Sequence, residues 1–234
     1  GRILDNPNGF NWDMNLNFSR NVNTVNRLAD GVSQYTLGGF DNVSILAVGG
    51  EPYGEIYGTK YQRVEDESSP YFGQIIVDEE GIPLASSDRE RLGNQQPDFL
   101  LGFSNSFRYK NLSLSFLVDA RIGGEIFSGT NRAIQNAGTG AREDLVIDGV
   151  VADGEGNFSP NTTGVSPQLY WMNLTERSGN LGINEANIYD ATNVRLRSVN
   201  LRYDLPNRWI ENTFFNQAYA GISANNVWMI DSNL

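Results

Sequence analysis

Residues 99–122 read FLLGFSNSFRYKNLSLSFLVDARI, and their pattern of apolar and polar residues indicates the fold class. Apolar and polar side chains alternate in it with a period of two, first from Phe99 to Tyr109 and again from Leu112 to Ala120. Successive side chains of a β-strand point to opposite faces, so each half has one apolar and one polar face. The break at Lys110-Asn111 is short enough for a tight turn. The stretch therefore predicts a long antiparallel hairpin.

The same alternation marks further strands outside the hairpin. In residues 10–20, the apolar side chains Phe10, Trp12, Met14, Leu16 and Phe18 alternate with polar ones. A strand over 187–205 changes phase near Arg197-Ser198, as a β-bulge would cause. Another strand, over 218–229, begins with small and apolar side chains on one face. Residues 53–63 form a further expected strand, whose facing the pattern does not assign.

Composition excludes several classes of function. The chain has no cysteine, so a disulfide framework and a thiolate metal site are impossible. It has no histidine, which removes the Ser-His-Asp and Cys-His catalytic arrangements and the common zinc sites. A formal net charge of −11 is unfavourable for nucleic-acid binding, which needs a basic face against phosphates. We expect neither enzymatic activity nor a cofactor.

Two long polar insertions, over residues 64–97 and 123–186, interrupt the strands. Loops of this length are uncommon in compact soluble domains, whereas outer-membrane barrels combine short periplasmic turns with long extracellular loops. No run approaches the length of a transmembrane helix, but a barrel strand crosses with only about 9–11 residues. The pattern therefore favours a transmembrane β-barrel. The alternative is a soluble, secreted all-β carbohydrate-binding module, in which the apolar face would pack against a second sheet.

Several runs of sequence resemble a known family. They are GEPYGEIYG at residues 50–58, LGNQQPDF at 92–99 and YDATNVRLR at 189–197, and Asn184-Glu185-Ala186 and residues 116–125 fit the same place. Together they resemble the C-terminal barrel region of SusC/RagA-type TonB-linked, or TonB-dependent, transporters, over about residues 10–224.

The resemblance implies an all-β fold, a large antiparallel transmembrane β-barrel of about 22 strands. This chain would supply about six of them, at residues 10–20, 53–63, 98–110, 111–122, 187–205 and 218–229. They would run down at 10–20, up at 53–63, down at 98–110 and then alternately, with the loops at about 64–97 and 123–186 extracellular. The plug domain and the closing terminal strand would be absent from this chain.

The same resemblance implies a place and a function. The protein would lie in the lipid of the bacterial outer membrane and import an oligosaccharide or peptide cargo. A SusD-like surface lipoprotein would close over its extracellular mouth. TonB would act through the missing N-terminal part of the protein, and the remaining barrel segments would complete the wall.

The candidate site residues form two groups. Tyr170 and Trp171 lie in the second long insertion, where an aromatic ring could stack on a sugar. Packing within the loop is the simpler explanation, since aromatic side chains bury large areas wherever they lie. Charged residues on the polar faces of the strands are predicted to line the lumen: Arg108, Asp119, Arg121, Arg195, Arg202 and Asp204. Asp153, Glu155 and Asn157 depart from the calcium-loop pattern and indicate a turn, so no metal site is expected.

Overall fold

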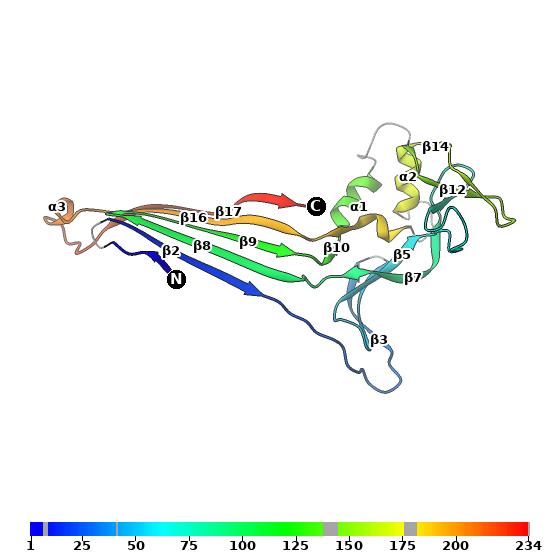
Figure 1. The fold of residues 1–234 in the computed structure, drawn as a ribbon. Helices are drawn as coiled ribbons and strands as arrows, with labels where there is room; N and C mark the ends of the chain where they lie inside the picture. The colour runs from blue at the N-terminus through cyan, green and yellow to red at the C-terminus, as the bar shows by residue number, and fades with distance from the viewer. Residues whose placement is uncertain (7–8, 41, 138–144, 176–181, 234) are drawn as a thin grey trace. The chain divides into compact units, whose positions relative to one another are not determined.

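The computed structural model describes residues 1–6, 9–40, 42–137, 145–175 and 182–233, and it divides into two compact units (Figure 1). The first, which we call the sheet unit, comprises Gly1–Asn21, Gln96–Gly124 and Asp190–Leu234. The second, the loop unit, comprises Val22–Gln95 and Glu125–Tyr189. The loop unit is therefore built from two insertions, one between residues 21 and 96 and the other between residues 124 and 190. No helix of the described residues is long and apolar enough to cross a membrane.

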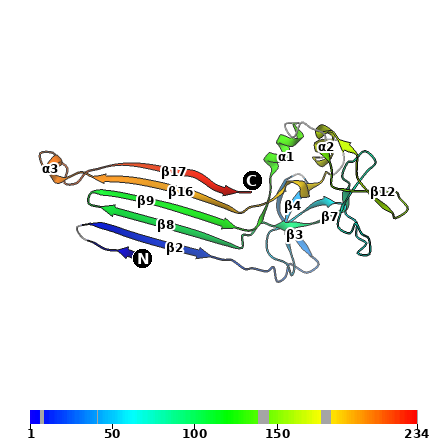
Figure 2. The same ribbon diagram turned by 45° about the horizontal axis from the view of Figure 1, so that its top comes forward.

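One antiparallel sheet makes up most of the sheet unit, in the order β1-β2-β8-β9-β16-β17 (Figure 2). Its six strands are β1 (Arg2–Leu4), β2 (Phe10–Ser19), β8 (Phe99–Tyr109), β9 (Leu112–Ile122), β16 (Asn193–Asp204) and β17 (Tyr219–Ser232). The short helix α3 (Asn207–Ile210) lies in the connection between β16 and β17. β1 and β17 are the edges, so the sheet is open in this chain.

The hairpin and the bulge that the sequence predicts are both present. β8 and β9 pair from Phe99 with Ile122 to Tyr109 with Leu112. Lys110 has a positive φ of 52°, the left-handed conformation that tight hairpin turns require. In β16 the register shifts between Leu196 and Ser198 against both neighbouring strands. The hairpin follows from the period-two alternation, and the bulge follows from the change of phase near Arg197-Ser198.

The side chains of the sheet separate onto two faces. On one face, which we call the apolar face, Phe103 lies between Leu16 and Val118 across the strands. Aromatic rings continue this face, with Phe107 5.8 Å from Trp12 and 6.0 Å from Phe116 between ring centroids. On the other, the polar face, Ser and Asn residues alternate with the charged side chains. The separation has exceptions. Asn105 lies on the apolar face, where Trp12 Nε1 donates a hydrogen bond to it at 3.0 Å, and Leu100 and Leu117 lie on the polar face.

The predicted strand 53–63 is not part of this sheet. Its residues form β5 (Glu55–Tyr61), which pairs with β4 (Val43–Val48) and β7 (Ala85–Asn94) in the loop unit. Glu55, Ile56 and Thr59 are all at most 1% exposed, so both faces of β5 are covered. A strand that is buried on both faces loses its period-two signal, and this is why its facing was not assigned from sequence.

Two further corrections follow from the place of β5. The first long insertion spans residues 22–95 rather than 64–97. In addition, β2 pairs directly with β8 and runs antiparallel to it, whereas the prediction had residues 10–20 and 98–110 running in the same direction. The ten consecutive residue pairs from Phe10–Tyr109 to Ser19–Leu100 fix this orientation.

Small sheets and short helices make up the loop unit. A four-stranded sheet has the order β3-β4-β5-β7 and a three-stranded one β13-β12-β6, and β10 pairs with β15 and β11 with β14. The remaining bounds are β3 (Gln34–Phe40), β6 (Ile75–Val77), β10 (Glu125–Phe127), β11 (Leu145–Val146), β12 (Gly149–Ala152), β13 (Phe158–Pro160), β14 (Gly164–Val165), β15 (Ile188–Asp190), α1 (Gly129–Asn136), α2 (Pro167–Leu174) and the 3₁₀ helix η1 (Asn184–Asn187). Val64, Ile76 and Val150 form a buried cluster that brings both insertions into one core.

Candidate functional site

Both insertions of the loop unit leave and re-enter the sheet at the same end. Ser19, Phe99, Ile122 and Asn193 are the strand residues at these exits, and their register places them along one end of the sheet. At the opposite end, β8 and β9 join through a two-residue turn. The connection between β16 and β17, which contains α3, is also at this end and is much shorter than either insertion. Long connections at one end of a sheet and shorter ones at the other are typical of outer-membrane barrel strands.

The charge of the chain is divided unequally between the units. The loop unit has 20 Asp and Glu against 8 Lys and Arg, a formal charge of −12. The sheet unit has 8 acidic and 9 basic residues, a charge of +1, which together with the loop unit gives the −11 of the chain. A net charge of this size on one unit repels polyanions and attracts cations at low ionic strength.

The predicted lumen-lining charges share the polar face of the sheet. Arg108 lies between Asn11 and Ser113, Arg121 between Leu100 and Asn193, and the others follow the same parity. Near the β16–β17 turn, Arg202 bonds Asp204 at 2.7 Å and lies 4.0 Å over the ring of Tyr219. The structure therefore brings these charges onto one face, and their contact with a lumen stays a prediction.

A second charge cluster lies nearer the end where the insertions leave. Arg195 is directly opposite Asp119, and its Nη2 lies 3.1 Å from Asp119 Oδ2. Arg197 donates to the same oxygen from Nη2 at 2.7 Å and from Nε at 3.2 Å. Sequence reasoning included Arg195 but missed Arg197, because Arg197 is at the phase change and its facing was not assigned.

Tyr170 and Trp171 both belong to α2 in the loop unit. Their rings meet edge to face with centroids 4.8 Å apart, and Tyr170 Oη lies 3.5 Å from Tyr61 Oη. Burial raises the pKa of both the Tyr61 and the Tyr170 hydroxyl, so both remain neutral at physiological pH. In this structure both rings pack within the loop unit, and stacking on a sugar stays a prediction.

Polar contacts tie η1 to β5 across more than 120 residues of sequence. Thr59 Oγ1 donates to the Gly182 carbonyl at 2.8 Å and accepts from Asn184 N at 3.1 Å. Glu185 accepts two bonds from Arg63, at 2.9 and 3.0 Å, and one from Tyr61 N at 2.9 Å. The hydrogen bonds that Arg63 donates to Glu185 are the main cause of the raised pKa of Arg63. Asn184 and Glu185 belong to one of the sequence runs that resemble the transporter family, but the neighbouring sequence does not indicate which residues they contact.

We expect Thr59→Val to destabilise this connection by about 1–3 kcal/mol, because it leaves the buried Asn184 N–H without an acceptor. The volume of the side chain hardly changes, so the hydroxyl is the only group lost. Hydrogen exchange of the intact protein should show faster exchange in β5 and η1. Thr36→Val, at an exposed position of β3, is the control and should change exchange by less than about 0.5 kcal/mol.

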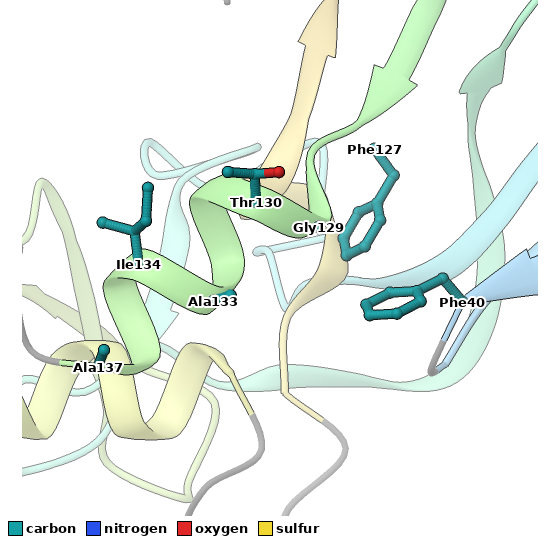
Figure 3. A pocket seen from close by; sticks show the side chains of 7 residues that line it. All are labelled: Phe40, Phe127, Gly129, Thr130, Ala133, Ile134 and Ala137. Atoms are coloured by element: carbon teal, nitrogen blue, oxygen red, sulfur yellow. The ribbon is translucent and has the colours of Figure 1, made fainter.

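An apolar pocket of about 720 Å³ lies beside α1 in the loop unit (Figure 3). Phe40 of β3 and Phe127 of β10 line one side, with ring centroids 6.3 Å apart. The other lining residues are Gly129, Thr130, Ala133, Ile134 and Ala137. A Cβ at Gly129 would lie 3.3 Å from Phe40 Cε1, so glycine permits this ring to approach the helix. The pocket can take an apolar group.

Asp153, Glu155 and Asn157 lie close together in an exposed segment of the loop unit. No group of three or more acidic, histidine or cysteine side chains in the described part of the chain could hold an ion. Asp153 accepts hydrogen bonds from Asn157 Nδ2 at 2.7 Å and from Glu155 N at 2.8 Å, which lower the pKa of its carboxyl and close a turn.

Comparison with known proteins agrees with this geometry. The chain is 28% identical over 239 residues to TonB-dependent receptor P3 of Formosa agariphila, covering 93% of this chain and 22% of that receptor. It is 27% identical to receptors P26 and P39 of the same organism, over 84% and 94% of this chain. The chain thus spans about a fifth to a quarter of the length of these relatives. No family model matches it.

Solved structures show the same fold. The chain resembles the RagAB peptide transporter with a TM-score of 0.58 and 19% identity, over 98% of this chain and 24% of that one. The "open-open" state of the RagAB peptide importer gives a TM-score of 0.57. The all-β fold is thus that of part of a TonB-dependent barrel, although the sheet does not close within this chain. The chain is therefore similar in sequence to part of TonB-dependent receptors of the outer membrane, and its fold is similar to part of the RagAB peptide transporter.

Proposed function

We propose that this chain forms part of the wall and of the extracellular loops of a TonB-dependent importer of oligomeric nutrients. The observation that carries the proposal is the exposed apolar face of the sheet. Leu16, Phe18 and Ile222 on this face are 62%, 63% and 74% exposed. A soluble sandwich would bury these side chains against a second sheet, whereas a barrel wall presents them to lipid. The apolar face is therefore assigned to the membrane.

The polar face is assigned to the interior of the barrel. Its charged residues pair with one another, as Arg195 and Arg197 do with Asp119, and this keeps the wall polar without isolated charges. The loop unit, whose insertions both start at one end of the sheet, is assigned to the extracellular side. There it would contact the cargo and a SusD-like lipoprotein.

Two features of the loop unit bear on the cargo. Its charge of −12 disfavours a polyanionic polysaccharide and favours peptides or neutral glycans. The pocket lined by Phe40 and Phe127 offers an apolar contact to such a cargo or to the lipoprotein. Because the relatives are receptors, we propose transport and not catalysis as the activity of the whole protein. The soluble carbohydrate-binding module is disfavoured by the exposed apolar face.

Uptake by living cells tests this proposal. Bacteria with and without the intact gene would be given fluorescent neutral peptides and neutral oligosaccharides of several residues. We expect gene-dependent uptake of at least one of the two, and its loss when TonB is deleted or the proton gradient is collapsed. Gene-dependent binding at the surface without any TonB-dependent uptake would contradict the importer assignment.

A further inference from the structure

We infer that Arg195 and Arg197 form a carboxylate-binding site on the polar face of the sheet. The ligand would be a carboxylate group of the cargo, from either a peptide or a uronic-acid sugar. This inference rests on the proposed function, since it requires that the polar face lines the route of the cargo.

The backbone places two guanidinium groups side by side. Arg195 is paired with Asp119, while Arg197 is the extra residue of the bulge, because pairing passes from Leu196–Val118 to Ser198–Leu117. Both side chains reach the same carboxylate oxygen, at 3.1 and 2.7 Å. The bulge thus adds the second arginine beside Asp119, and it shifts the register of β16 by one residue from Ser198 onward.

The cluster of Arg195, Arg197 and Asp119 has a net positive charge and N–H donors that Asp119 does not use. Two guanidinium groups share one carboxylate, which leaves a net charge of +1. Each guanidinium has five N–H donors, and three bonds to Asp119 occupy only a few of them. Arg195 Nε is buried and has no acceptor among the described residues. The side chains of Arg195 and Arg197 are 36% and 43% exposed, so both are open to a ligand from the polar side.

The surface beside the cluster has room for a ligand. Gly102 lies opposite Asp119 on β8, and Asn17 lies beyond it on β2. A Cβ at Gly102 would meet nothing closer than Asn17 Cβ, at 3.7 Å. The sheet is therefore bare on the side of Asp119 away from Arg195. A group that lies there is next to Asp119, and the two guanidinium groups that bind Asp119 lie on its other side.

A carboxylate is the chemical group that this arrangement favours. Guanidinium groups bind carboxylates through two parallel hydrogen bonds, and their planar fork matches the two oxygens. A single carboxylate neutralises the surplus charge of +1. A polyanion would meet the −12 of the loop unit as well, so cargo with one or few carboxylates fits both units.

Binding to the intact transporter in detergent tests the site. The probes are short peptides of Gly, Ala and Ser with a free C-terminus, the same peptides with an amidated C-terminus, and neutral oligosaccharides with or without one terminal uronic acid. The variant is Arg195→Gln with Arg197→Gln, and a second version adds Asp119→Asn so that no unpaired carboxylate remains. Arg202→Gln is the matched control, because Arg202 lies on the same strand and face but pairs with Asp204.

For the native protein, we expect the acidic member of one probe pair, either the peptides or the oligosaccharides, to bind about 10-fold to 100-fold more tightly than the neutral member. This is the range of a hydrogen bond to a charged group. Both double and triple variants should bind the two alike, and Arg202→Gln should keep the preference. The pair that shows the preference identifies the source of the carboxylate. Tight binding or uptake without any preference, or a preference that survives in the variants, would overturn the site but leave the importer intact. Absence of binding and of uptake for all probes would overturn both.

Discussion

Replacing Arg91 with alanine is expected to destabilise the pairing of β5 with β7 by about 3 kcal/mol, because it leaves a buried carboxylate without its cation. Glu55 is 0% exposed, and Arg91 forms an ion pair with it from the neighbouring strand. Arg91 Nη2 lies 3.3 Å from Glu55 Oε1, which also accepts from Asn94 Nδ2 at 2.9 Å. The bonds to Glu55 are the first cause of the raised pKa of Arg91. The value is at the low end of the range for buried pairs, since the arginine side chain is half exposed.

The matched control is Lys60→Ala in the same pair of strands. Lys60 Nζ lies 3.1 Å from Glu90 Oε2, and the two side chains are 33% and 48% exposed, so the loss of this pair should cost less than about 1 kcal/mol. Hydrogen exchange of β5 and β7 in the intact protein measures both effects. Equal losses of protection in the two variants would show that burial of Glu55 does not set the energy of this pair.

The second large effect is expected from Phe103→Arg on the apolar face. If this face contacts lipid, an arginine near the middle of β8 should cost about 2–4 kcal/mol. Ser104→Arg, one residue further, places the same charge on the polar face and should cost much less. Urea unfolding of the intact protein in lipid, followed by heat-modifiable electrophoretic mobility, gives both free energies. Similar costs at the two positions would argue that neither face is next to lipid.

The sheet could be predicted from sequence because only one of its faces is apolar. Along Phe99–Ile122 every second residue meets the same environment, so the periodicity, the turn and the register follow from the residues themselves. The phase change at Arg197-Ser198 likewise located the bulge. The polar-face charges from Arg108 to Asp204 were found by the same parity.

The loop unit could not be predicted in the same way. β5 and β4 carry buried residues at successive positions, such as Glu55 and Ile56, so neither shows a clean alternation. The bonds from Arg63 to Glu185 join residues 122 apart in sequence, and no local pattern indicates such a partner. Arg197 shows the limit of prediction within the sheet. The sequence indicates the bulge, but it does not indicate which face the side chain of the bulge residue lies on.

In a barrel wall, successive residues of β8 would face lipid and the barrel interior in turn. Single nitroxide labels at Leu101, Gly102, Phe103, Ser104, Ser106 and Phe107, in the intact protein reconstituted in lipid, test this alternation most directly. The chain itself contains no cysteine, which keeps this region free of background labelling. We predict that oxygen dissolved in the bilayer collides most with labels at 101, 103 and 107, and a water-soluble nickel complex with those at 102, 104 and 106. Equal collision rates at all six positions, or the reverse alternation, would contradict the assignment of this chain to a barrel wall.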